Sequence, residues 1–150
     1  MHTWPQRVII HLPRILVGSV LVITGLAKVL DMPGFAEVLS HYQLFNNLTI
    51  YTVIAYTLPF VELAIGFSLL LSWQTRWAAL GAIALHLIFI IILTITLLRN
   101  IPISNCGCFG VFLARPLTWT TILEDVVMIA FSVSILMLPV RPPKYGGRPT

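Results

Sequence analysis

Four long apolar stretches, separated by short polar or proline-containing connectors, constrain the fold of this chain more than any other feature. They cover about residues 9–30, 48–71, 77–98 and 118–138. About 20 apolar residues in a helix are enough to cross the hydrocarbon core of a bilayer. The chain is also 58% hydrophobic and only 9% charged, which a soluble domain of 150 residues cannot bury. The sequence therefore predicts an all-α, four-transmembrane-helix bundle with the lipid bilayer as its solvent.

The connectors and ends of the chain give further expectations. Residues 1–150 are expected to form a single membrane domain, because the apolar stretches are too evenly spread to leave room for a soluble domain. We expect the first stretch to be kept and not cleaved as a signal peptide, since Lys28 and Asp31 stand where a cleavage site needs small residues. The apolar spacing within residues 31–47 predicts a short interfacial segment after helix one. Residues 140–150 are expected to be a disordered, basic tail.

The basic residues predict one orientation in the membrane. Four spans place both termini and the connector after the second span on one side, together with six of the nine basic residues: Arg7, Arg14, Arg76, Arg141, Lys144 and Arg148. The other side has three, Lys28, Arg99 and Arg115. The positive-inside rule then predicts a multi-pass protein of the plasma (inner) membrane with cytoplasmic termini and an exoplasmic loop over residues 99–117. The net charge of +4 lies at segment ends, so it indicates topology and lipid contact, and no nucleic-acid partner is implied.

Both cysteines of the chain, Cys106 and Cys108, lie in this loop with one glycine between them. Gly107 permits the bend that a disulfide over so short a spacing needs, and the oxidising exoplasmic space predicts that the bond forms and remains reducible. A structural turn without redox activity is a second interpretation. A disulfide over this spacing would stabilise the fold little, because it closes almost no loop. Metal binding is a third, but two thiolates are half of a tetrahedral zinc site, and we expect no metal.

Two ionisable residues within the spans are predicted to share a depth in the membrane. Glu62 precedes the end of the second stretch by nine residues, and His86 follows the start of the third by nine. We therefore expect the two side chains to hydrogen-bond to each other, because residues of this kind inside a bilayer have partners. The pair has two interpretations, a structural hydrogen bond or a proton path and head-group site for a membrane quinone.

Other charged residues lie near the predicted exoplasmic ends of the helices. Thr24, Lys28 and Asp31 share one face of the first helix, where Lys28 is either an interfacial anchor or a group that stabilises a thiolate in the cysteine loop. Residues 121–124, Thr-Ile-Leu-Glu, fit a capping box at the start of the fourth helix. Glu124 and Asp125 are then expected to complement the positive end of that helix.

The cysteine run and two helix motifs together suggest a family. Cys106-Gly107-Cys108-Phe109-Gly110, placed after the third of four helices, resembles the MauE branch of the DoxX-like membrane proteins, which is named for methylamine utilisation. Gly25-Leu26-Ala27-Lys28 and Pro59-Phe60-Val61-Glu62 look like DoxX-type signatures. The similarity covers about residues 14–138.

The resemblance implies a membrane protein of redox maturation. MauE proteins are needed to make methylamine dehydrogenase, in disulfide formation beside the thioredoxin-like protein MauD. By this resemblance Cys106 and Cys108 are the catalytic thiol pair, and Lys28 and Glu62 are intramembrane polar positions typical of the family. A thioredoxin-like periplasmic protein and its client are the implied partners, and since the chain has one thiol pair, its electrons leave to a membrane quinone or a second protein. Together with His86, Lys28 and Glu62 are the expected quinone or proton site. The alternative is a non-catalytic scaffold or assembly factor with a structural Cys-Gly-Cys loop.

Overall fold

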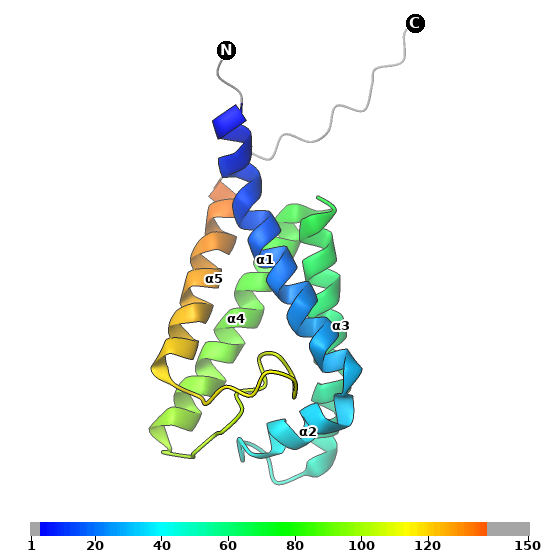
Figure 1. Ribbon diagram of the computed structural model, residues 1–150, viewed down its shortest axis with the longest axis vertical. Coiled ribbons are helices and arrows are strands. Elements are labelled where there is room, and N and C mark those ends of the chain that lie inside the picture. The colour runs from blue at the N-terminus through cyan, green and yellow to red at the C-terminus, as the bar shows by residue number, and fades with distance from the viewer. Residues whose placement is uncertain (1–3, 138–150) are drawn as a thin grey trace, which may run out of the picture.

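The computed structural model describes residues 4–137, which form five helices (Figure 1). These are α1 (Trp4–Leu30), α2 (Met32–Ser40), α3 (Leu48–Leu70), α4 (Thr75–Leu98) and α5 (Trp119–Met137). The four long helices each contain a stretch long and apolar enough to cross a membrane, so the predicted multi-pass, all-α bundle is confirmed. The short α2 confirms the predicted segment after the first span. The tail expected over residues 140–150 lies outside the described residues.

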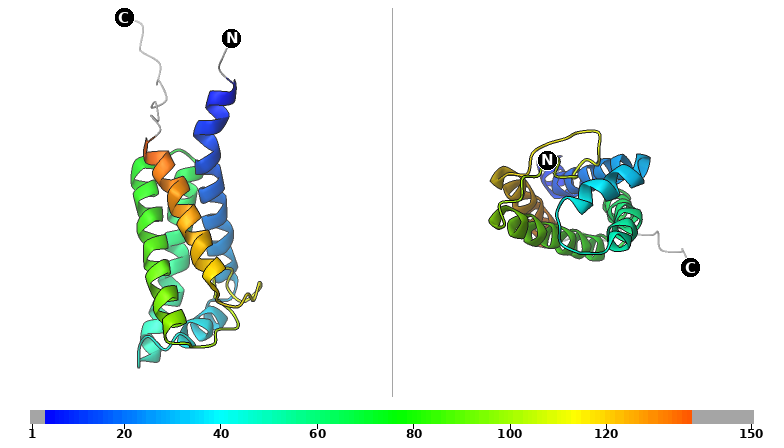
Figure 2. Two further views of the ribbon diagram at one scale, coloured as in Figure 1. Left: turned by 90° about the vertical axis from the view of Figure 1, so that its left-hand side faces the viewer. Right: turned by 90° about the horizontal axis from the view of Figure 1, so that it is seen from below.

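The bundle is built from two helix pairs, α1 with α3 and α4 with α5, which meet through further contacts of α1 with α5 and of α3 with α4 (Figure 2). Glycines let α1 and α3 approach closely. A Cβ atom on Gly66 would lie 2.9 Å from the carbonyl oxygen of Gly18, so a larger residue would push the two backbones apart. This close crossing brings side chains of α1 and α3 within reach of each other near the cysteine loop.

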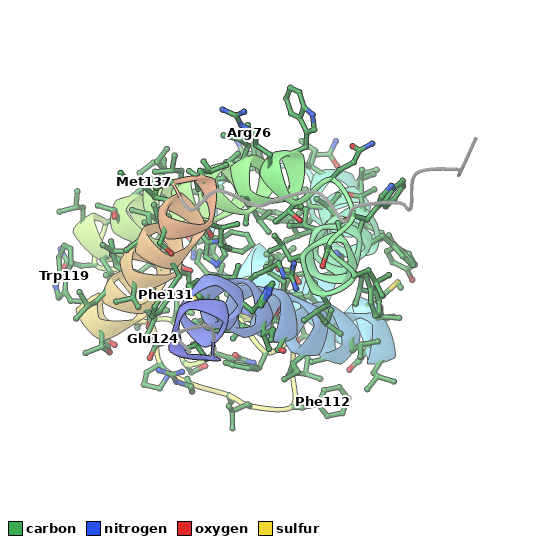
Figure 3. All side chains as sticks on the ribbon, turned by 90° about the horizontal axis from the view of Figure 1, so that it is seen from above. Arg76, Phe112, Trp119, Glu124, Phe131 and Met137 are labelled. Carbon is green, nitrogen blue, oxygen red and sulfur yellow. The ribbon has the colours of Figure 1, made fainter. Side chains whose placement is uncertain are left out.

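Apolar side chains cover the outside of the long helices (Figure 3). Exposed examples occur on every one of them: Ile23, Leu26, Val53, Phe60, Ile88, Ile91, Leu123 and Val126. A surface so extensively apolar is not stable in water, where contiguous exposed patches are small. The bilayer is therefore the medium that covers these faces.

The helix α2 and the loop over residues 99–118 lie together at one end of the bundle, while α1 begins and α5 ends at the other (Figure 1). Asp31 caps α2 by accepting a hydrogen bond from the Gly34 backbone N–H at 2.9 Å. The apolar face of α2 is buried, with Phe35 only 2% exposed and Val38 also in the interior. This face supports the loop that carries the two cysteines.

Candidate functional site

The cysteine loop is a compact turn held by the Asn105 side chain. Its Oδ1 atom accepts a hydrogen bond from the Gly107 N–H at 3.0 Å, and its Nδ2 atom donates to the Gly110 carbonyl at 3.1 Å. The Gly110 N–H in turn donates to the Gly107 carbonyl at 3.0 Å. Both glycines have left-handed backbones, with φ of +72° at Gly107 and +62° at Gly110, which L side chains rarely adopt. The two cysteines therefore project from a backbone whose path depends on glycine.

The turn is also fixed to the rest of the bundle. The Cys106 N–H donates to the Arg115 carbonyl at 2.8 Å, and the Cys106 carbonyl accepts from the hydroxyl of Tyr42 at 2.7 Å. Gly110 lies against the backbone of α1, where a Cβ atom would be 3.0 Å from the Ala27 carbonyl oxygen. The backbone of the loop is thus held from both sides.

The two thiols are in contact. The Sγ atoms of Cys106 and Cys108 lie 3.1 Å apart and share a hydrogen bond, with both residues present as free thiols. Cys106 is 7% exposed, whereas Cys108 is half-buried. This is an arrangement from which a disulfide can form, and the disulfide itself remains a prediction.

The contact between the two sulfur atoms shifts the pKa values of the two thiols in opposite directions. The hydrogen bond from the Cys108 side chain, helped by backbone N–H groups and the Arg115 guanidinium, outweighs burial and lowers the pKa of Cys106 to about 6. The same shared hydrogen bond, together with burial, raises the pKa of Cys108. The pair therefore gives up its first proton readily and its second with difficulty, so at neutral pH it carries one thiolate.

A buried ion pair lies inside the bundle beside the loop. The Lys28 Nζ atom of α1 is 2.6 and 2.8 Å from the two carboxylate oxygens of Glu62 on α3, and both side chains are almost fully buried, at 3% and 1% exposed. The ammonium also lies over the rings of Phe35 and Phe89, at 5.5 and 5.8 Å from their centroids. The interpretation of Lys28 as an interfacial anchor is therefore wrong, because its charge points into the protein.

The predicted hydrogen bond between Glu62 and His86 is also wrong, since each has another partner. His86 Nδ1 lies 2.7 Å from the Ala82 carbonyl oxygen, which can only accept, so this nitrogen carries a proton. The Nε2 atom of His86 faces Asp125 of α5, 4.0 Å from its Oδ1 atom. Their positions along consecutive helices predict that Glu62 and His86 share a depth in the membrane. The close crossing of α1 and α3 nevertheless places Lys28 next to Glu62, so the carboxylate pairs with the ammonium.

The start of α5 differs from the predicted capping box. The helix begins at Trp119, and the Thr121 hydroxyl is buried without a hydrogen-bond partner among the described residues. Glu124 instead forms a partly exposed ion pair with Arg115 of the cysteine loop, with nitrogen–oxygen distances of 2.6 and 3.2 Å. Asp125 points inward, and its Oδ2 atom is buried and likewise has no hydrogen-bond partner within residues 4–137. The sequence does not indicate this inward direction, because Asp125 and Glu124 are adjacent acids at a helix start.

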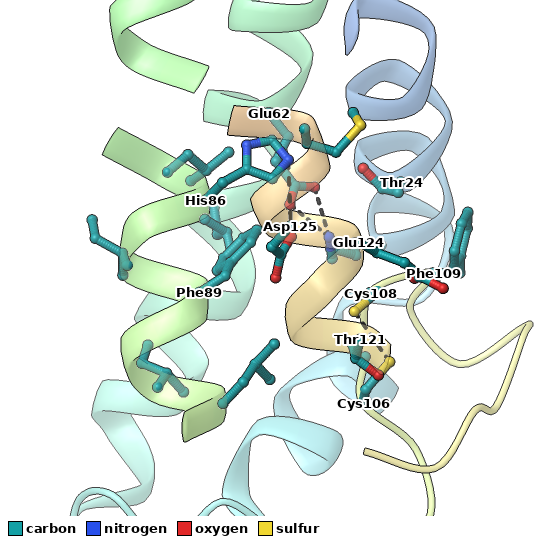
Figure 4. A pocket seen from close by; sticks show the side chains of 18 of the residues that line it. Thr24, Glu62, His86, Phe89, Cys106, Cys108, Phe109, Thr121, Glu124 and Asp125 are labelled. Carbon is teal, nitrogen blue, oxygen red and sulfur yellow. Dashed lines mark hydrogen bonds and ion pairs between the residues drawn. The ribbon is translucent and has the colours of Figure 1, made fainter. Parts of the chain in front are cut away.

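These groups line one cavity of about 880 Å³, shown in Figure 4. Most of its lining is apolar, and its polar members come from every long helix and the loop, among them Thr24, Lys28, Glu62, His86, Thr121, Asp125, Cys106 and Cys108. The predicted site residues Lys28, Glu62 and His86 are thus brought together with the cysteines. Within residues 4–137 no group of three or more His, Cys, Asp or Glu side chains is placed to hold a metal ion.

Comparison with known proteins gives one family. The family model described as methylamine utilisation protein MauE matches residues 6–138. The methylamine utilization protein MauE of Paracoccus denitrificans is 30% identical over 130 residues, which cover 87% of this chain and 69% of that protein. No solved structure matches the chain.

Proposed function

Because this chain belongs to the MauE family of methylamine utilisation proteins, we propose that it exchanges a disulfide with a partner protein during the maturation of a client such as methylamine dehydrogenase. The observation that carries the proposal is the 3.1 Å contact between the sulfurs of Cys106 and Cys108 in a loop fixed on both sides. Thiol–disulfide exchange needs two sulfurs that can bond to each other and then separate with little backbone movement.

The difference between the two thiols supports a different role for each in the proposed exchange. A thiolate of the partner attacks the Cys108 sulfur of the oxidised pair, because Cys108 is the more exposed of the two. Cys106 then leaves as a thiolate, which is favourable because its pKa of about 6 makes it a good leaving group. A second thiol of the partner attacks the mixed disulfide and releases Cys108. The partner dithiol is oxidised to a disulfide, and two electrons and one proton have moved to the cysteine pair, which is left as the Cys106 thiolate and the Cys108 thiol.

The implied partner is a thioredoxin-like protein in the exoplasmic space, together with its client. The count of basic residues supports this side of the membrane for the loop, since six of nine lie at the ends and connector opposite it. An oxidising compartment would hold the pair as a disulfide between turnovers.

A scaffold without redox activity is the second candidate, and one observation favours it. Cys106 is 7% exposed and its backbone is hydrogen-bonded on both sides, as expected of a residue that shapes a docking loop. Under this alternative the thiols serve only as small apolar side chains.

Substitution of both cysteines separates the two candidates. The variant with Cys106→Ser and Cys108→Ser keeps the size of both side chains and so preserves the loop. In a strain that depends on this protein, the exchange function predicts loss of active client, with the variant present in the membrane in normal amounts. Normal client maturation by that variant would exclude the exchange function and leave the scaffold.

A further inference from the structure

The 880 Å³ cavity reaches from the thiol pair to the buried charges, and its volume lies within the range of small-molecule sites, about 300–1,000 Å³. We propose that it binds a lipid-soluble quinone, which accepts the two electrons that the cysteine pair has taken from its partner. This inference rests on the proposed exchange function, and it names the acceptor of that same site. Four groups of observations carry it.

The first is a pair of polar atoms without partners. Thr121 Oγ1 and Asp125 Oδ2 are both buried, neither has a hydrogen-bond partner among the described residues, and both residues line the cavity. They are four residues apart on α5 and so share one face of the helix. A buried polar atom left without a hydrogen bond is costly, which indicates that a polar part of a ligand is accommodated here.

The second is that the polar groups suit both redox forms of a quinone. A quinone carbonyl needs donors, and the Thr121 hydroxyl and the Lys28 ammonium supply them. Lys28 has three N–H groups, and among residues 4–137 its hydrogen bonds go to Glu62 alone. A quinol hydroxyl needs acceptors, and Asp125 Oδ2 is one. His86 is another when neutral, because Nδ1–H donates to the Ala82 carbonyl and leaves the Nε2 lone pair free.

The third is access from the membrane. The cavity lining includes Ile88 and Leu123, which are also 53% and 61% exposed on the apolar surfaces of α4 and α5. The cavity wall therefore continues into the surface that lipid covers. An acceptor with an apolar tail can remain in the bilayer while its polar ring lies among the buried charges.

The fourth is the need for an acceptor. The 150 residues of this sequence contain two cysteines, so they offer no second thiol pair to which the reduced pair can pass electrons. The Cys106 thiolate and the Cys108 thiol instead form a sulfur–sulfur bond, and the two electrons released reduce the quinone ring. The quinol takes one proton from the Cys108 thiol and one from the protonated form of Asp125 or His86, which regains its proton from solution. Thiolate, thiol, quinone and one proton thus become disulfide and quinol.

Binding is tested without the thiol chemistry, on the full chain carrying Cys106→Ser and Cys108→Ser in detergent, by calorimetric titration with decylubiquinone. We expect saturable binding that Thr121→Val weakens by about two- to tenfold, the range for one lost hydrogen bond. Valine has the shape of threonine, and the hydroxyl has no hydrogen-bond partner in the part of the chain that the structure describes, so this variant should fold normally. Thr57→Val is the matched control, because that hydroxyl bonds the Val53 carbonyl on an exposed face of α3. Leu58→Trp, which fills the cavity, should abolish binding.

Electron transfer is tested on the reduced protein with both cysteines, mixed with decylubiquinone without oxygen. One quinol should form for each disulfide counted by mass spectrometry, and more slowly in the Thr121→Val variant at subsaturating quinone. Absence of binding, or equal binding by the Thr121→Val and Thr57→Val variants, would overturn the site. Binding without quinol formation would overturn the electron-transfer step. Exchange with the partner is judged separately, from covalent adducts formed without added quinone, so the two proposals fail independently.

Discussion

Lys28 and Glu62 form a two-contact ion pair, at 2.6 and 2.8 Å, between α1 and α3 in the interior of the bundle. The pair lies where glycines allow the two backbones to approach, and aromatic rings of α2 and α4 lie beside the ammonium. It thereby joins four elements around the cavity, and each charge depends on the other for its stability in an apolar surrounding.

We predict that loss of one partner is worse than loss of both. Lys28→Met or Glu62→Gln alone should destabilise the protein by about 3–5 kcal/mol, the usual cost of leaving a buried charge or its partner unpaired. The double variant should recover much of that loss, because no buried charge remains. Thermal unfolding in detergent measures the three variants.

The exposed pair Arg115 and Glu124 provides the control for this cycle, since its side chains are 36% and 54% exposed. Arg115→Met and Glu124→Gln should have much smaller effects, because exposed ion pairs contribute little. Equal effects of the buried and exposed cycles would contradict the structural role assigned to Lys28 and Glu62.

The thiol pair should show a pH dependence set by its first proton. The lowered pKa of Cys106, about 6, means that a thiolate is present above pH 6 and is lost as the pH falls below it. The rate of alkylation of the reduced protein by iodoacetamide, followed by mass spectrometry, should therefore have a midpoint near pH 6. Cys108→Ala, which removes the hydrogen-bond donor, should move this midpoint upward, and Cys108→Ser should move it less. A midpoint at the ordinary thiol value, about 8.5, in the unsubstituted protein would refute the assignment.

Covalent adducts should distinguish the two cysteines. With Cys106→Ser, a mixed disulfide between Cys108 and the partner can be resolved only by the partner's second thiol and no longer from this protein's side, so it should accumulate. Cys108→Ser should trap less, because the remaining Cys106 is buried. Non-reducing electrophoresis of membranes from cells that contain the partner measures both. Equal trapping by the two variants would contradict the order of attack, and trapping by neither would contradict the exchange.

The orientation prediction concerns the side of the membrane on which the loop lies. Treatment of intact, reduced cells with a membrane-impermeant maleimide should label Cys106 or Cys108, since the loop is expected on the exoplasmic side. The variant with both cysteines replaced by serine serves as the blank. Labelling that occurs only after the membrane is broken would reverse the predicted topology.

The glycines of the cysteine loop should tolerate substitution poorly. Gly107→Ala must adopt a left-handed backbone, which costs about 1–2 kcal/mol, and its Cβ atom would lie 3.0 Å from a methyl group of Val38. Thermal unfolding should show this loss, and the thiol pair should lose its low-pH reactivity as the loop moves. Gly81→Ala is the control, because it lies within α4 and its nearest neighbour is the flexible end of Ile65, at 3.2 Å. A Gly107 variant as stable and as reactive as the control would show that the turn does not depend on glycine.

The sequence was sufficient for the helices and insufficient for the partners of their polar side chains. Length and hydropathy predict α1, α3, α4 and α5, because a bilayer demands long apolar helices whatever their neighbours. The ion pair was missed because it depends on which helices touch, and α1 packs along α3 through glycine contacts that carry no distinctive pattern. The sequence predicts for Asp125 only a charge that complements the positive end of α5, because its inward direction follows from the rotation of α5 about its own axis.

Gly110 lies against the carbonyl of Ala27, next to the residue that anchors the buried ion pair. Neither side of this contact is a side chain that can rotate away, so the cysteine turn cannot tilt without moving a turn of α1. The two thiols therefore belong to a rigid part of the structure and not to a mobile loop. When a partner protein binds, the movement has to come from the partner. The partner's own thiol must lie on a segment flexible enough to reach the stationary cysteine pair.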